Sequence, residues 1–107
     1  MQKDLFAGIA AELENAERSR LAEKEGRARV CARRAAGMAA RAFLTRHGVQ
    51  TRGSAYTALQ ALTEFPGLAP NLRTAAIHLT TRVNETFALP EDIDLIVEAR
   101  KLIEGLQ

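Results

Sequence analysis

The sequence predicts an all-α protein, an up-and-down bundle of four or five helices in a single domain over residues 1–107. Apolar residues recur at helical spacing along the chain, and no segment alternates as a half-buried β-strand does. Aromatic residues make up only 5% of the chain and tryptophan is absent, so the core is built mainly from Ala, Leu, Ile and Val. Such a core favours closely packed helices. A chain of 107 residues leaves no room for a second independent core.

The first helix is expected over 3–24. Its inner stripe recurs at helical spacing and is continued by an arginine: Phe6, Ile9, Leu13, Ala16 and Arg20. A turn is expected near 24–26, because glycine allows the backbone to reverse direction. A continuous bent helix through Gly26 is the alternative.

The second helix, over 26–47, is expected at the centre of the bundle. Residues 26–48 hold six arginines and one histidine with no acid, on a background of alanine, glycine and medium-sized apolar residues. Arg27, Arg34 and Arg41 form a stripe at seven-residue spacing, which leaves little surface dedicated to solvent. Gly37 costs about 1 kcal/mol relative to alanine, so we expect a neighbouring helix to approach closely there. Gly48 follows as the C′ residue.

The remaining helices are predicted from their end signals. A polar loop over 49–53 precedes Ser54, the expected N-cap of a short third helix. Pro70 fits the first turn of a fourth helix over 70–84, whose inner stripe includes Val83. Pro90 is expected to begin the last helix, with acidic residues near its positive N-terminal end.

The charge is unevenly distributed along the chain. Residues 1–25 carry a net −2, residues 26–82 a net +8 and residues 83–107 a net −4. One interpretation is internal neutralisation, in which the terminal helices pair with the central arginines. The other is a basic surface for phosphate or nucleic acid, with Arg27, Arg46 and Arg82 as contacts.

Other sequence features bound the location and chemistry of the protein. A single cysteine, Cys31, excludes an intrachain disulfide and is interpreted as a buried apolar residue. No apolar run approaches the ~20 residues that span a bilayer, and no signal-peptide pattern is present. We therefore expect a cytoplasmic protein without membrane contact. No motif indicates a cofactor.

The arginine stripe of the second helix needs partners if it lies inside the bundle. Buried guanidinium groups are rare without carboxylates, and the acidic last helix offers candidates. We expect an ion-pair layer, with an anionic ligand as the alternative, made by the following residues: Arg34, Arg41, Asp92, Asp94 and Glu98. Asp94 and Glu98 are four residues apart, but no further ligand is nearby in the sequence, so a metal site is not expected.

A second candidate site is Arg73 and His78. Five residues along a helix place these side chains about 140° apart, so they do not share a face. His78 is expected on a polar face, where histidines are mostly exposed. It is also a general-base candidate near neutral pH, but then needs an arginine from elsewhere, such as a second chain.

Two segments resemble the HEPN superfamily of small helical bundles. One is CARRAAGMAARAFLTRHGVQ followed by a short helix from Ser54, and the other is Arg73-x4-His78, which is similar to the family's Arg-x(4–6)-His motif. The resemblance covers roughly residues 5–106. It implies an up-and-down bundle that is commonly dimeric. Some members are metal-independent ribonucleases, while others partner a minimal nucleotidyltransferase or bind nucleotides.

The predicted function is a non-catalytic, HEPN-like module that binds a ligand or a protein partner, as a homodimer. A nucleotidyltransferase-like protein, RNA or a nucleotide are the candidate partners. One alternative is a ribonuclease, in which Arg73 stabilises phosphate charge and His78 transfers protons, as the resemblance implies. Thr74 and Thr80 depart from the residues typical of nuclease members. The other alternative is a nucleic-acid-binding protein that uses the basic central helix.

Overall fold

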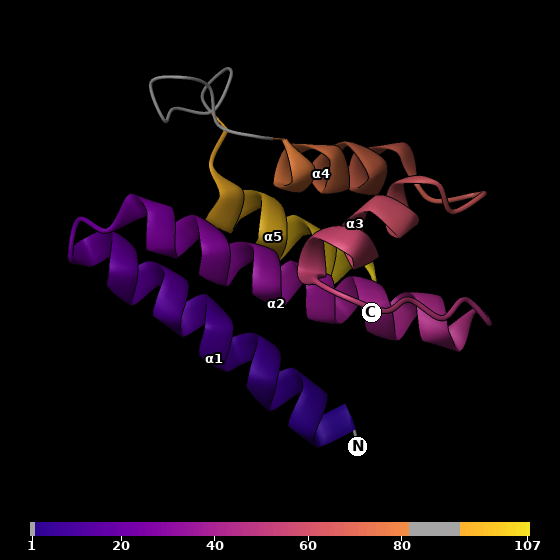
Figure 1. Ribbon diagram of the computed structural model, residues 1–107, viewed down its shortest axis with the longest axis horizontal. Coiled ribbons are helices and arrows are strands. Elements are labelled where there is room, and N and C mark those ends of the chain that lie inside the picture. Colours follow the sequence, from indigo (N-terminus) through magenta and orange to yellow (C-terminus); the bar gives the residue numbers. More distant parts are fainter. Residues whose placement is uncertain (1, 82–92) are drawn as a thin grey trace.

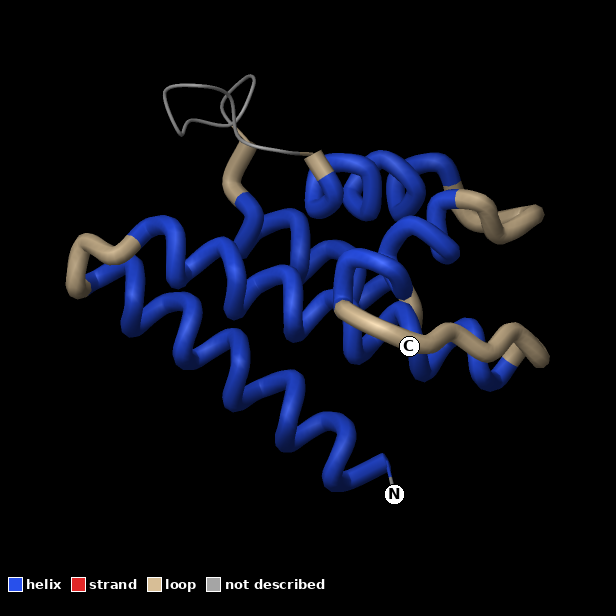
Figure 2. The backbone as a smooth tube through the Cα atoms, in the orientation of Figure 1, coloured by secondary structure: helices blue, strands red, loops and turns tan. Residues whose placement is uncertain are grey.

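The protein is an all-α bundle, as predicted. A computed structural model describes residues 2–81 and 93–107, and Figure 2 shows that they form only helices and loops. The five helices are α1 (Gln2–Leu21), α2 (Glu25–Arg46), α3 (Ala55–Thr63), α4 (Pro70–Thr80) and α5 (Leu95–Gly105). In Figure 1, α1 and α4 run in one direction along the bundle, and α2 and α5 run in the other. No helix in these residues is both long and apolar enough to cross a membrane.

Helices α1 and α2 form an antiparallel hairpin along one side of the molecule (Figure 1). A short turn joins them, closed by a 2.8 Å hydrogen bond from the Lys24 amide to the Ser19 carbonyl. Glu23 adopts a φ of +59° in this turn, a conformation that non-glycine residues rarely adopt. The turn therefore lies slightly earlier than predicted, and Gly26 belongs to the first turn of α2.

Helix α2 is the central element, as expected, and packs against α1, α3 and α5. Its interior face, however, is made by small side chains rather than by the arginine stripe: Ala28, Ala32, Ala35, Ala36 and Ala40 are fully buried. The close approach predicted at Gly37 is confirmed, because a Cβ there would overlap Ala55 at the start of α3.

Several helix ends match the sequence signals, and two do not. Ser54 caps α3 by accepting a hydrogen bond from the Thr57 amide, and Pro70 lies in the first turn of α4. Helix α4 ends at Thr80 rather than at residue 84. The last helix begins at Leu95, because the Asp94 side chain caps its first turn. Val83 and Pro90 lie outside the described residues.

Candidate anion-binding pocket

Arg73 and His78 have separate partners in the described residues. Arg73 donates from Nε to the Thr63 carbonyl (3.0 Å) and from Nη2 to the Phe65 carbonyl (2.9 Å), at the C-terminal end of α3. The last carbonyls of a helix lack intrahelical donors and carry partial negative charge. Arg73 therefore caps α3, and the structure does not bring it together with His78.

His78 faces α5 instead of solvent, so the expectation of a merely exposed histidine is wrong. Its Nδ1 lies 2.7 Å from Oε1 of Glu98, a carboxylate that is only 11% exposed. Lys101 approaches the other oxygen of Glu98 at 3.7 Å. The glutamate fixes the orientation of the imidazole, and the histidine supplies a partner for a carboxylate that would otherwise be buried with little compensation.

The predicted layer of Arg34 and Arg41 with the acids of the last helix is wrong. The Arg34 side chain is 60% exposed, and the one carboxylate that it approaches among the described residues is that of Glu12, at 4.0 Å. Arg41 bonds the α2–α3 loop through Thr51 Oγ1 and the carbonyls of Gly53 and Ser54. The reason is the alanine face of α2: it occupies the interior and turns the arginine stripe toward α1, solvent and the loop. Asp92 lies outside the described residues.

Arg20 of α1, rather than Arg34 or Arg41, pairs with the predicted acid Asp94. Its guanidinium binds both oxygens of Asp94 at 3.1 and 2.9 Å and both oxygens of Glu25 at 3.0 and 2.7 Å. The hydrogen bonds from Arg20 hold the pKa of Glu25 below its ordinary value. Burial raises the pKa of Asp94, but hydrogen bonds from the Val97 amide and from Arg20 outweigh it, so that this pKa is also lowered. The signal was present in the sequence, because Arg20 continues the inner stripe of α1.

Two further arginines of α2 cap other helices. Arg46, one of the predicted phosphate contacts, donates to the Leu106 carbonyl at the end of α5 (2.8 Å). Arg33 donates to the Leu79 and Thr81 carbonyls at the end of α4 (2.8 and 3.3 Å). Three arginines of α2, namely Arg33, Arg41 and Arg46, therefore donate to backbone carbonyls. The sequence did not predict this role. Arg82, the third predicted contact, lies outside the described residues.

Four other cationic side chains line a pocket between α1 and α2, near the turn that joins the helices. Its volume is about 540 Å³, within the range of about 300–1,000 Å³ typical of ligand sites. The polar residues that line it are Glu12, Asn15, Arg18, Ser19, Lys24, Arg27 and Arg34. Four of these side chains are cationic and one is acidic, so the pocket attracts anions. Buried Cys31 also lines it.

Lys24 and Arg27 are the cations of this pocket that are best placed to take a ligand. Among residues 2–81 and 93–107, neither side chain makes a hydrogen bond or an ion pair. Arg18 approaches Glu14 only at 3.7 Å, and both side chains are 73% exposed. Solvent-exposed ion pairs of this kind contribute about 0–1 kcal/mol, so an anion competes with them readily.

The N-terminus of α2 opens into the same pocket. No side chain caps it, and Gly26 in its first turn lines the pocket. A Cβ added to Gly26 would meet no atom within 4 Å, so the space above this backbone is open. The positive end of a 22-residue helix therefore lies at the wall of the pocket, beside Lys24 and Arg27.

The described ranges hold no group of three or more His, Cys, Asp or Glu residues suited to a metal ion. Comparison with protein-family models, with curated proteins and with solved structures finds no match to this chain. The resemblance to the HEPN superfamily therefore stays a prediction from the quoted motifs.

Proposed function

We propose that this protein is a non-catalytic, HEPN-like helical module that binds a small phosphate-bearing ligand in the pocket between α1 and α2. The observation that carries the proposal is a pair of cations, Lys24 and Arg27, whose side chains have no partner among the described residues and which lie beside the start of α2. Phosphate oxygens accept hydrogen bonds from ammonium, guanidinium and helix N-terminal amide groups. Asn15 and Ser19 add neutral polar groups to the same wall.

Titration calorimetry with pyrophosphate and with ADP tests this proposal. We expect saturable binding of one ligand per chain, and tighter binding of ADP if the ligand is a nucleotide. Gly26→Glu places a carboxylate in the open space and should abolish binding, whereas Gly26→Ala should retain it. Because Gly26→Ala adds no charge, it is the matched control for folding.

A second pair of variants separates a defined site from general attraction to a basic protein. Arg27→Ala should weaken binding about tenfold, the scale of one charge-assisted hydrogen bond. Arg52 is exposed, lies in the loop beyond the other end of α2, and is the matched cation for Arg52→Ala. Equal losses in the two variants, or no saturable binding in the wild-type chain, would contradict the proposal.

The ribonuclease alternative has less support. Among the described residues, Arg73 donates to two carbonyls at the end of α3, while His78 pairs with Glu98 of α5. The two candidate catalytic side chains therefore do not form one site within the chain. The nucleic-acid alternative also has less support, because Arg33, Arg41 and Arg46 are held at three separate places and do not line one basic strip. These places are the end of α4, the α2–α3 loop and the end of α5. Incubating the protein with varied RNAs in the presence of a chelator tests cleavage directly.

Homodimerisation and a nucleotidyltransferase-like partner belong to the same proposal, since both rest on the HEPN resemblance. Sedimentation equilibrium over a range of protein concentrations tests the homodimer. A concentration-independent monomer mass would contradict it.

A further inference from the structure

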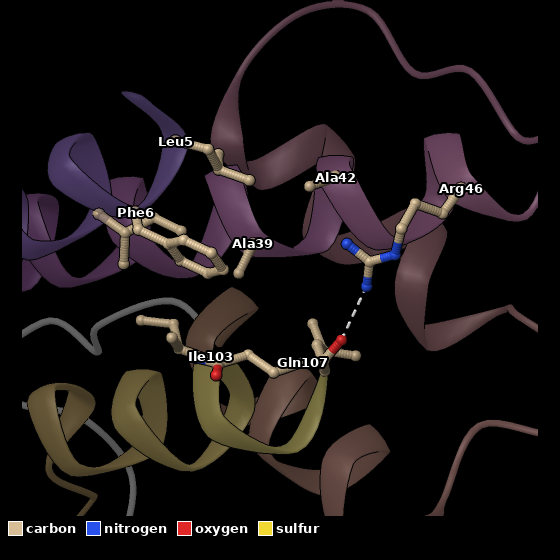
Figure 3. A pocket seen from close by; sticks show the side chains of 9 residues that line it. Leu5, Phe6, Ala39, Ala42, Arg46, Ile103 and Gln107 are labelled. Atoms are coloured by element: carbon tan, nitrogen blue, oxygen red, sulfur yellow. Dashed lines mark hydrogen bonds between the residues drawn. The ribbon is translucent and has the colours of Figure 1, made fainter. Parts of the chain in front are cut away.

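A second, chemically different cavity lies between the N-terminal half of α1, the C-terminal half of α2 and the end of α5. Its volume is about 310 Å³, and seven of the nine residues that line it are apolar. Figure 3 shows Phe6 of α1 toward one end of this cavity and Arg46 of α2 at the other. This cavity shares no lining residue with the pocket between α1 and α2.

Small side chains on α2 leave this cavity open. Ala39 and Ala42 face the space between α1 and α5, two helices that touch each other little. Buried core residues such as Ile9 and Ile103 contribute to its wall, with exposures of only 5% and 7%. Phe6 is 46% exposed, which is high for a large apolar side chain and adds apolar surface that a ligand can cover.

The one charged side chain of this cavity lies at one end of it. To the described residues, the Arg46 guanidinium donates one hydrogen bond, from Nη2 to the Leu106 carbonyl. A guanidinium has five N–H donors, so others remain for a ligand. An apolar channel that ends in a cation has the polarity of an alkyl chain that ends in an anion.

We propose that this cavity binds a medium-length alkyl carboxylate, with the chain between Phe6 and Ile103 and the carboxylate at Arg46. Burial of the alkyl chain against the apolar wall residues favours binding. The carboxylate adds a charge-assisted hydrogen bond from Arg46. This site is independent of the phosphate-bearing ligand proposed for the pocket between α1 and α2.

The test compares decanoate with decanol, both below the concentrations at which they aggregate, by calorimetry on the full chain. Wild-type protein should bind both saturably at one site, and decanoate about tenfold more tightly because of its charge. Arg46→Gln should remove this preference while the affinity for decanol stays the same. Arg46→Lys should keep most of it, because the charge is retained.

Ala42→Leu fills the cavity and should abolish binding of both ligands while the melting temperature is maintained. Unchanged decanol binding in Arg46→Gln shows that the cavity is intact, so a folding defect cannot mimic the expected result. The proposal is overturned by the absence of saturable binding, by a preference for decanoate that survives Arg46→Gln, or by binding that survives Ala42→Leu. It is equally overturned if sedimentation shows a dimer that Phe6→Asp dissociates, because a second copy then covers the cavity.

Discussion

The substitution Arg73→Ala should destabilise the fold strongly, because Arg73 caps the end of α3. It removes two hydrogen bonds from a charged donor, to the carbonyls of Thr63 and Phe65 at 3.0 and 2.9 Å. Hydrogen bonds to charged groups contribute about 1.5–3 kcal/mol each. These carbonyls belong to half-buried residues, so water replaces part of what is lost.

We therefore expect Arg73→Ala to lower the free energy of unfolding by about 2 kcal/mol, less than the sum of two such bonds. For a chain of this size, that loss corresponds to a fall of about 9 °C in the melting temperature. Thermal and urea denaturation followed by circular dichroism at 222 nm measure both quantities.

Arg52→Ala is the matched control, since it removes one exposed arginine and should change stability by less than about 0.5 kcal/mol. Equal melting temperatures for the two variants would refute the reasoning. Arg73 would then be free to act on a ligand, as the ribonuclease alternative requires. If Arg73→Ala is destabilising, a loss of activity in that variant is not by itself evidence of catalysis.

Three other substitutions test the remaining contacts, each by urea denaturation. Arg20→Ala should cost about 1–2 kcal/mol at pH 7, whereas Arg18→Ala, on the exposed face of the same helix, should cost almost nothing. Gly37→Ala should destabilise the fold by about 1–3 kcal/mol, although alanine has the higher helix propensity, because the added Cβ would overlap Ala55 at the start of α3. His78→Ala should cost about 1–3 kcal/mol by leaving buried Glu98 with a weaker partner, and an unchanged stability would mean that the contact contributes nothing.

The contacts of Arg20 also predict how stability depends on pH. Both carboxyls that bind it, Glu25 and Asp94, have pKa values lowered in the folded state from 4.5 and 3.8. A carboxyl with a depressed folded pKa stabilises the fold above its unfolded pKa, and this stabilisation is lost as pH falls through the folded pKa. Wild-type stability should therefore decline below about pH 4.5, and Arg20→Ala should show a shallower decline. Parallel pH profiles for the two proteins would contradict this account.

The fold was predictable wherever one residue type fixes local geometry. The hydroxyl of Ser54, the fixed φ of Pro70 and the missing Cβ of Gly37 each act through the adjacent backbone or a single close contact, so a linear sequence reveals them. The start of the last helix was misplaced because Pro90 and Asp94 are both good start signals, and Asp94 is the residue that caps α5.

The arginine partners were not predictable, for a physical reason. Alanine is so frequent in α2 that the buried face of the helix gives a weak hydrophobic signal. The conspicuous stripe of Arg34 and Arg41 therefore predicts an interior position that these side chains do not have. The carbonyls that accept from Arg41 and Arg73 leave no trace in the sequence, because every residue carries one. The tertiary contacts therefore decide which cationic side chains remain available to a ligand.

Backbone amide chemical shifts, recorded while pyrophosphate is added to the ¹⁵N-labelled chain, test the central claim most directly. We predict that the largest saturable shifts occur at Gly26 and Arg27, where the N-terminus of α2 lines the pocket between α1 and α2. Shifts that are largest near Arg52, or that grow linearly without saturation anywhere, would contradict the assignment of this pocket as the ligand site.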